Sequence, residues 1–465
     1  MSDFSERLTQ EATTAQARLG ELRDAGVEHL ILGYPDLQGN LRTKIGPVKW
    51  SGSGDSFNGI FYCMGHGDGL PSTEPCFEAP VCSEDEGYPN ILGVTDLSTA
   101  YAHPWHPGYG SALQDSYLAD GRRCPIDPRG MVARLDAEAR EIGVDARFAL
   151  EVECGIFEAD SAAIQAGAFS SLSLWGQSVG GYNGLRDGGF HEFVAEFTRR
   201  CAALDVEVTA FSTEHGFGMY EFGLAPRTAL RACDDAVRAR HLLRELCLER
   251  GLVATFMARF RPPQQESACG AHTHVSLWRD GQPVTLGDDG SFSAQARQFL
   301  AGMLEHLPAT HLMFRPTINA YRRYSRAAWS PVDVSWGLEN RAAAIRAITA
   351  PNAAAARFEH RVSGADINPY HTVAAMLAAG CDGVRRQLEP PAPLEAPPAQ
   401  DRLALPATLE ASLETFEASG FCQKAFGEQA HAHLVAAARF ELQAFQEWLD
   451  SHITEFEWQR YFLTA

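Results

Sequence analysis

The sequence predicts an α+β fold in which a small N-terminal domain precedes a larger one. Two observations lead to this prediction. Residues 27–48 have the pattern of a strand, a turn at Asp36 to Gly39 and a second strand, which is typical of a β-hairpin. After residue 125, short strand patterns alternate with long helical patterns. We therefore expect a boundary near residues 115–125, with domains at 1–118 and 119–465.

The other elements are predicted in chain order. Residues 1–22 indicate an amphipathic surface helix, and residues 51–125, rich in Gly, Pro and Asp, predict loops with short strands. A turn and an amphipathic helix follow at 124–144. Strands are expected at 146–158, 206–216, 218–224, 252–260, 271–278 and 356–362. Helices are expected at roughly 228–250, 293–306, 371–388 and 430–450, and the proline-rich stretch 388–401 predicts an extended surface loop.

Composition narrows the class of protein. The 465 residues are 45% hydrophobic, which is enough for a sizeable core, and the formal net charge is -20. That acidic balance disfavours a nucleic-acid partner. The eleven cysteines have no C-x-x-C spacing, so they do not indicate a disulfide framework or a structural zinc site. We find no signal-peptide or transmembrane pattern, and we expect a cytoplasmic protein without a membrane partner.

Polar side chains are predicted to share one face of several strands, because strand side chains alternate. Glu151 and Glu153 point away from the apolar side of their strand, and a Gly-Phe-Gly turn could bring Glu214 and Glu221 together. Two further strands have same-face polar sets: His272, His274 and Ser276; Arg357, Glu359 and Arg361. Any one of these could be an ordinary solvated face of an antiparallel sheet.

Taken together, these faces indicate a metal-assisted site for an anionic substrate. Carboxylates on adjacent same-face positions repel one another unless a cation lies between them. Several carboxylates with one or two histidines suit Mg²⁺ or Mn²⁺ better than Zn²⁺. Arginines gather between residues 322 and 346, and guanidinium groups bind phosphate and carboxylate oxygens. Because no G-x-x-x-x-G-K-[ST] loop is present, we predict phosphoryl transfer without a P-loop.

Six motifs in order then reveal a family resemblance, which runs from about residue 27 to the end of the chain. They are "LEVECGIF", "EHGFGMYEFGL", "GAHTHVSLW", "PTINAYRRY", "ENRAAAIR" and "RFEHRVSGADINPY". On these motifs the chain resembles the glutamine synthetase superfamily, in particular its γ-glutamylpolyamine and γ-glutamylamide synthetases. The resemblance implies a β-grasp-like N-terminal domain and a large catalytic α/β domain with a curved antiparallel sheet. It also implies a homo-oligomer, commonly a dodecamer, with active sites at subunit interfaces.

The resemblance implies a role for each matching residue. Two or more Mg²⁺ or Mn²⁺ ions would be bound by two sets of ligands: Glu153, Glu214 and Glu221; Glu151, His272 and Glu359. Arg323 would bind the α-carboxylate of glutamate, with Ser267, Ala268 and Gly270 around the amino acid. The residues implied along ATP are Glu214, His274, Ser276, Arg341, Arg346 and Arg357. Arg341, Arg361 and Trp329 would act in catalysis, with Arg361 at the transferring phosphoryl group.

Three departures from the family pattern bear on the second substrate. Trp329 stands where glutamine synthetases have a glutamate that helps to bind ammonium, and an indole can pack against an alkyl or aryl amine or offer its π face to a cation. The family's ammonium-deprotonating aspartate has only Asp68 as a stand-in. Ser267 and Ala268 replace an asparagine and a glycine. Trp329 could also simply pack against its neighbours.

We therefore expect an ATP-dependent ligase that joins the γ-carboxylate of glutamate to an amine through a γ-glutamyl phosphate. Candidate amines are polyamines, ethanolamine, alkylamines and arylamines. Three alternatives stay open: a glutamine synthetase that uses ammonium, a non-catalytic oligomer of the same family, and a guanidino-phosphate kinase. Retention of the metal ligands and arginines disfavours the non-catalytic reading.

Overall fold

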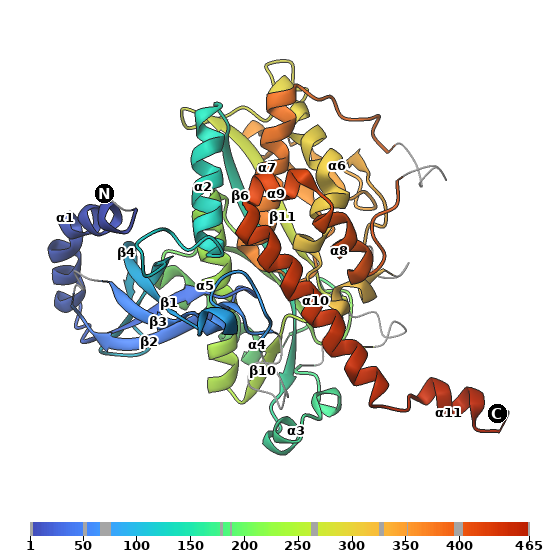
Figure 1. Ribbon diagram of the computed structural model, residues 1–465, viewed down its shortest axis with the longest axis horizontal. Helices are drawn as coiled ribbons and strands as arrows, with labels where there is room; N and C mark the ends of the chain where they lie inside the picture. The colour runs from blue at the N-terminus through green and yellow to red at the C-terminus, as the bar shows by residue number, and fades with distance from the viewer. Residues whose placement is uncertain are drawn as a thin grey trace.

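The computed structural model shows two sheets with helices packed around them (Figure 1). It describes residues 3–49, 54–65, 76–176, 180–186, 188–261, 268–324, 330–350, 352–394 and 403–463. The smaller sheet lies at one end of the molecule beside the N-terminal helix α1 (Asp3–Asp24), and the larger sheet forms the main body. The predicted α+β class is confirmed.

The smaller sheet has five strands in the order β2-β1-β5-β4-β3. The predicted hairpin is confirmed, because β1 (His29–Pro35) pairs antiparallel with β2 (Leu41–Pro47). The other strands are β3 (Asp55–Asn58), β4 (Asn90–Ala102) and β5 (Tyr109–Tyr117), and β5 lies parallel to β1. Helix α1 packs its apolar face, including Leu19 and Leu22, against this sheet.

The expectation of loops and short strands across 51–125 is wrong for β4 and β5, which have 13 and 9 residues. Their polar residues Asp96 and Asp115 are buried, so the strands lack the apolar alternation that marks a strand in sequence. The burial is possible because the guanidinium of Arg129 pairs with both, at 2.6 Å and 2.5 Å. Arg129 also pairs with Asp234 at 3.0 Å, so one guanidinium connects two aspartates of the smaller sheet to an aspartate in a helix of the larger domain.

The larger sheet follows the order β13-β14-β15-β11-β6-β8-β7, with β9, β10 and β12 attached at its sides. Its strands are β6 (Asp145–Glu158), β7 (Val208–Thr213), β8 (Met219–Leu224), β9 (Arg227–Thr228), β10 (Leu252–Thr255), β11 (Ala271–Arg279), β12 (Gln282–Pro283), β13 (Trp336–Leu338), β14 (Ile345–Ile348) and β15 (Arg357–His360). All six predicted strands are present, although β7, β10 and β15 are shorter than expected. The short strands β13 and β14 were not predicted.

Long helices cover one face of this sheet and form the main core with it (Figure 1). They are α2 (Pro128–Glu141), α5 (Ala229–Glu249), α6 (Ala294–Phe314) and α7 (Pro369–Arg386), all close to their predicted positions. Helix α2 begins where the Asp127 side chain accepts a hydrogen bond from the backbone N–H of Arg129, with a proline at the first helical position. Helix α6 continues past the predicted end, because Pro308 is accommodated within it.

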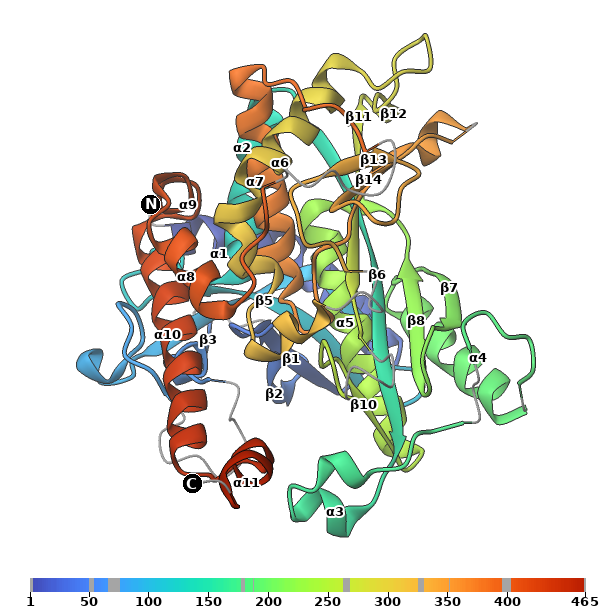
Figure 2. The same ribbon diagram turned by 90° about the vertical axis from the view of Figure 1, so that its right-hand side faces the viewer.

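The remaining helices lie around this core. They are α3 (Ser161–Gln165), α4 (Gly188–Ala203), α8 (Leu409–Glu417), α9 (Gly420–Phe426), α10 (Glu428–Asp450) and α11 (Glu455–Tyr461). Figure 2 shows α4 beside β7 and β8, at the edge of the larger sheet opposite α10. The proline-rich stretch has no regular structure at 388–394, and residues 395–401 lie outside the described residues. No helix in the described part of the chain is both long and apolar enough for a membrane span. All eleven cysteines are free thiols, ten of them buried.

Candidate active site

The face of the large sheet that points away from the main core borders a cavity of about 690 Å³. Its lining consists of Glu151, Glu153, Gly181, Tyr182, Glu214, His215, Met219, Glu221, Ala268, His272, Arg323, Arg341, Arg346, Arg357, Glu359 and Arg361. Most of the residues selected from the sequence are therefore brought together in one place. The cavity is acidic on one side and rich in arginine on the other.

Strand register places the polar residues opposite one another. On neighbouring antiparallel strands, Glu151 faces His272, Glu153 faces Glu221, and His274 faces Glu359. Directly opposed side chains lie on the same face of a sheet. The opposite face of the same strands holds core residues such as Leu150 and Val152. The predicted alternation of Glu151 and Glu153 with apolar neighbours is therefore confirmed.

The histidine side of the cavity gathers around Glu151 and Glu359. His274 Nε2 lies 3.1 Å from Glu151 Oε1, and His272 Nδ1 lies 3.6 Å from Glu359 Oε1. Burial would raise the pKa of Glu151, but hydrogen bonds from the two histidines lower it. Burial also opposes ionisation of Glu359, yet the charges of His272 and Arg361 hold its pKa at about 2. Both carboxylates are therefore kept ionised.

The acidic side has the opposite electrostatics. Burial and the nearby Glu153 raise the pKa of Glu214 to about 7, and burial with Glu153 and Glu214 raises that of Glu221 to about 9. Glu153 is fixed by the backbone N–H of Gly270, which donates to its Oε2 at 2.7 Å. Three carboxylates that repel one another in this way suit a bound cation, whose charge would favour their ionised forms.

Two sets of three side chains at or beside the cavity have potential ligand atoms within 4.8 Å of one another: Glu151, Glu221 and His272; Glu151, His274 and Glu359. The grouping expected from the family resemblance differs, because it separates Glu151 from Glu221 and leaves His274 beside the nucleotide. In the structure Glu151 is common to both sets. Carboxylate oxygens with an imidazole nitrogen are a donor set that divalent cations bind, so these residues fit such ions.

Arginines form the other wall of the cavity. Arg346 Nη1 donates to Glu359 Oε2 at 3.1 Å, while its Nη2 donates at 2.6 Å to Glu339, an acid outside the predicted site residues. Arg361 donates to Glu359 and, through Nε at 3.1 Å, to the backbone carbonyl of Arg341. The side chain of Arg341 is exposed. Hence positive charge accumulates beside the ionised Glu359, as an anionic substrate requires.

Arg357 lies farther along the same wall and contacts His274 of β11. Arg357 Nε donates to His274 Nδ1 at 3.1 Å, and its Nη1 donates to the carbonyl of Ala355 at 2.7 Å. Ser276 is on β11 but does not line the cavity; its hydroxyl accepts a hydrogen bond from Trp278 Nε1 at 2.9 Å. Of the predicted nucleotide residues, His274 and Ser276 are thus the two that do not line the cavity, although His274 contacts the cavity residues Arg357 and Glu151.

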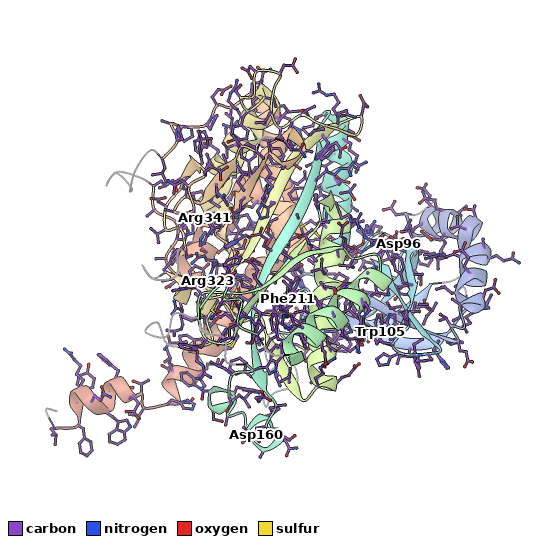
Figure 3. All side chains as sticks on the ribbon, turned by 180° about the vertical axis from the view of Figure 1, so that it is seen from behind. Asp96, Trp105, Asp160, Phe211, Arg323 and Arg341 are labelled. Carbon is purple, nitrogen blue, oxygen red and sulfur yellow. The ribbon has the colours of Figure 1, made fainter. Side chains whose placement is uncertain are left out.

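Arg323 is buried at the inner end of the cavity, with 2% of its surface exposed. Its Nη1 donates to the carbonyls of Val362, at 3.1 Å, and Ser363. A Cβ atom on Gly270 would lie 2.8 Å from Arg323 Nη2, so glycine is needed there for the guanidinium to reach this position. Figure 3 shows Arg323 close to Arg341 in the main body, and well away from Asp96 and Trp105.

Three predicted residues, Asp68, Ser267 and Trp329, lie outside the described residues, and their expected roles stay predictions. Four further cavity residues could not be selected from the sequence: Gly181, Tyr182, His215 and Met219. His215 and Met219 belong to the quoted "EHGFGMYEFGL" motif, where only the glutamates drew attention. Gly181 and Tyr182 stand in a glycine-rich stretch without periodicity, which offers no signal.

Comparisons with known proteins agree with this geometry. The chain is 30% identical over 384 residues to a glutamate–isopropylamine ligase of Pseudomonas sp., which covers 81% of this chain and 82% of the relative. It is 28% identical to γ-glutamylethanolamide synthetase GlnA4 of Streptomyces coelicolor, over 94% and 93% of the two chains. Proteins named glutamine synthetase also match.

A solved structure, the GmaS/ADP complex in conformation 1, shares the fold, with a TM-score of 0.77 at 22% identity over 99% of this chain and 100% of the other. Residues 125–461 match the family described as glutamine synthetase, catalytic domain. Members of that family are enzymes that use ATP and divalent metal ions. With its motifs, fold and cavity in agreement, this chain belongs to the glutamine synthetase family, in the branch that resembles the γ-glutamyl-amine ligases.

Proposed function

We propose that the protein is an ATP-dependent ligase that joins the γ-carboxylate of glutamate to an amine through a γ-glutamyl phosphate. The observation that supports this proposal most strongly is that one cavity has an acidic side and an arginine side. The acidic side suits cations and an amine, whereas the arginine side suits phosphates and a carboxylate. The names of the relatives, which join glutamate to isopropylamine or ethanolamine, support the same reaction for this chain.

In this proposal, Arg323 at the inner end binds the α-carboxylate of glutamate, between Gly270 and Ala268. Arg341, Arg346 and Arg357 bind the phosphates of ATP. Arg361 lies against Glu359 and the Arg341 carbonyl, which hold its guanidinium in place for the transferring phosphoryl group. A bidentate guanidinium neutralises phosphate charge in a fixed orientation, which is how such groups lower the barrier to phosphoryl transfer.

The described cavity residues would hold two or more ions, for which we propose Mg²⁺ or Mn²⁺. The proposed ligands are Glu151, Glu153, Glu214, Glu221, His272 and Glu359. When bound, such ions neutralise charge on the phosphate oxygens. The close approach of His274 to Glu151 makes His274 a further candidate ligand.

The reaction has two steps. A γ-carboxylate oxygen of glutamate attacks the γ-phosphorus of ATP, and ADP leaves as the new P–O bond forms. The neutral amine then attacks the γ-carbonyl carbon; a C–N bond forms, the C–O bond to phosphate breaks, and the nitrogen releases a proton. Phosphorylation is needed because a free carboxylate is a poor electrophile without a leaving group.

The same proposal includes the domain boundaries, the oligomeric state, the cellular location and three residues outside the described ranges. We propose domains at 1–118 and 119–465, a homo-oligomer such as a dodecamer, and a cytoplasmic location. We keep Trp329 as the residue against which the amine packs, Asp68 as a candidate proton acceptor, and Ser267 as part of the amino-acid site. The second candidate function is glutamine synthesis with ammonium, favoured by the relatives named glutamine synthetase.

Phosphate release from ATP with glutamate, Mg²⁺ or Mn²⁺, and a panel of amines tests the proposal. Polyamines, ethanolamine, alkylamines, aniline and ammonium form the panel, and mass spectrometry identifies the γ-glutamyl product. Turnover with an organic amine well above turnover with ammonium is expected. Turnover with ammonium alone would identify a glutamine synthetase, and ATP binding without turnover on any amine would contradict the ligase assignment.

A further inference from the structure

We propose that Arg315 is a positioning residue: it holds Arg323, the residue proposed to bind the glutamate α-carboxylate, and Ser330, the residue that follows the stretch 325–329. This inference rests on the proposed ligase function. Arg315 immediately precedes the "PTINAYRRY" motif and lies outside the predicted site residues. It is completely buried and does not line the cavity, so any effect on the reaction must pass through the residues that it contacts.

Arg315 is an unusual buried cation. It stands directly after α6, where its backbone N–H donates to the carbonyl of His311 at 3.1 Å. In the described part of the chain its guanidinium is paired with no carboxylate, and its partners are two carbonyls, a hydroxyl and an aromatic ring. Burial lowers its pKa to about 10, so it is still ionised at neutral pH. A buried charge with only neutral partners is costly, so stability alone gives little reason for an arginine here.

Arg315 and Arg323 share one hydrogen-bond acceptor. Arg315 Nε donates to the carbonyl oxygen of Val362 at 3.1 Å, and Arg323 Nη1 donates to the same oxygen at 3.1 Å. A carbonyl oxygen can accept both bonds because it has two lone pairs. The two positive charges repel each other, so Arg315 limits how far the guanidinium of Arg323 can withdraw from the cavity. Without Arg315, Arg323 loses that limit on its position.

The same guanidinium contacts the residues on both sides of the stretch 325–329, which lies outside the described residues. Before the stretch, its carbon Cζ lies 3.8 Å from the centroid of the Tyr324 ring. After the stretch, its Nη2 donates to the hydroxyl of Ser330, which is buried, at 2.5 Å. The Tyr324 hydroxyl is also hydrogen-bonded to His311 Nε2 at 3.0 Å. One side chain therefore fixes both neighbours of this stretch relative to Arg323.

The geometry of these contacts requires a guanidinium. Its nitrogens point in three fixed directions: Nε to Val362, Nη1 to the carbonyl of Ala320 at 3.4 Å, and Nη2 to Ser330. Its flat face lies over the aromatic ring. A lysine ammonium is a single point charge and could not make these contacts at the same time. Because Trp329 directly precedes Ser330 in the sequence and is proposed to contact the amine, we expect Arg315 to affect the binding of glutamate and the amine but not that of ATP.

Replacement of Arg315 by methionine tests the inference. The purified full-length enzyme is assayed by phosphate release with ATP, Mg²⁺, glutamate and the amine that the parent enzyme turns over fastest. We expect Arg315→Met to raise KM for glutamate and KM for the amine by about tenfold or more, which corresponds to about 1.4 kcal/mol each, with little change in KM for ATP. Arg315→Lys should show the same defects, because it keeps the charge but loses the fixed donors. Recovery of both KM values in the lysine variant would overturn the inference.

Ser330→Ala is a milder variant that removes one hydrogen bond and keeps the buried charge. It should raise KM for the amine several-fold and leave KM for glutamate close to the parent value, because the bonds to the shared Val362 carbonyl are untouched. This variant keeps the inference testable if Arg315→Met does not fold. A Ser330→Ala enzyme with the parent KM for the amine would refute the role of Arg315 in holding Ser330.

Arg240→Met is the matched control, because Arg240 is also buried, donates to a backbone carbonyl, that of Ile367 at 2.7 Å, and does not line the cavity. It should lower Tm and keep the parent KM values for all three substrates. Equal rises of KM in Arg240→Met and Arg315→Met, or an equal rise of KM for ATP in Arg315→Met, would show a general disturbance of the fold and overturn the inference. Absence of phosphate release by the parent enzyme with every amine would instead refute the ligase proposal, and the inference with it.

Discussion

Substitution of Gly270 by alanine tests the proposed glutamate site with a single added methyl group. The new Cβ would lie 2.8 Å from Arg323 Nη2 and 3.0 Å from His272 Nε2, both closer than real Cβ atoms normally approach. Arg323 is buried, and hydrogen bonds to the carbonyls of Val362 and Ser363 restrict its retreat. The guanidinium must therefore shift away from the position in which we propose that it binds the α-carboxylate.

The size of the effect follows from the bond that is weakened. Hydrogen bonds to charged groups contribute about 1.5–3 kcal/mol, so KM for glutamate should rise by roughly 10- to 150-fold. Steady-state phosphate release at saturating ATP and amine measures this change, and KM for ATP should change little. Gly20→Ala in α1 is the matched control, because its Cβ would meet nothing within 4 Å. A Gly270→Ala enzyme with the parent KM for glutamate would refute the assignment of Arg323.

Three further substitutions are expected to separate stability from binding. Arg129→Met should lower the free energy of unfolding by about 3 kcal/mol or more, because it leaves buried aspartates without their partner. Arg122→Ala should lower it by at most about 1 kcal/mol, since the ion pair of Arg122 with Asp120 is exposed. Thermal melting compares the two variants, and equal losses of stability would contradict the reasoning. Arg341→Ala should raise KM for ATP about tenfold without lowering Tm, because the side chain is exposed; a lower Tm with an unchanged KM would argue for a structural role. Burial and neighbouring carboxylates raise the pKa of Glu221 from 4.5 to about 9, so in metal-free protein this group lowers stability progressively as the pH rises from about 4.5 towards 9. Glu221→Gln should therefore raise the metal-free Tm more at pH 8 than at pH 5, and an equal gain at both pH values would count against this account.

Much of the fold could be predicted because the large sheet has one apolar face. In β6 and β11, apolar residues alternate with the polar ones of the cavity, and this period of two is visible in the sequence. The pattern fails in β4 and β5, where Asp96 and Asp115 are buried and compensated by Arg129, a residue distant in the chain. Sequence periodicity cannot reveal an ion pair that forms only after folding. Strands β13 and β14 have three and four residues, too few for a period to be recognised.

The site shows the same division between local and long-range information. Alternation predicted that Glu151 and Glu153 share a face, but it could not predict which residue of the neighbouring strand opposes each one. The register of β6 with β11 places Glu151 opposite His272, and β11 with β15 places His274 opposite Glu359. This is why the structure groups His274 with Glu151, whereas the family motif had assigned it to the nucleotide. Tyr182 carried no pattern at all and was found only through its position at the cavity.

The strand register also explains what fixes the positions of the cavity side chains. A slip of β11 by one residue against β6 would turn Thr273 and Val275 towards the cavity and His272 and His274 into the core. The core opposes that slip strongly, because it would expose apolar side chains and bury two imidazoles without partners. Residues such as Leu150 and Val152, which never touch a substrate, therefore determine where the carboxylates lie. The mutual repulsion of Glu153, Glu214 and Glu221 is tolerated because the apolar face on the other side of the same strands supplies the opposing stability.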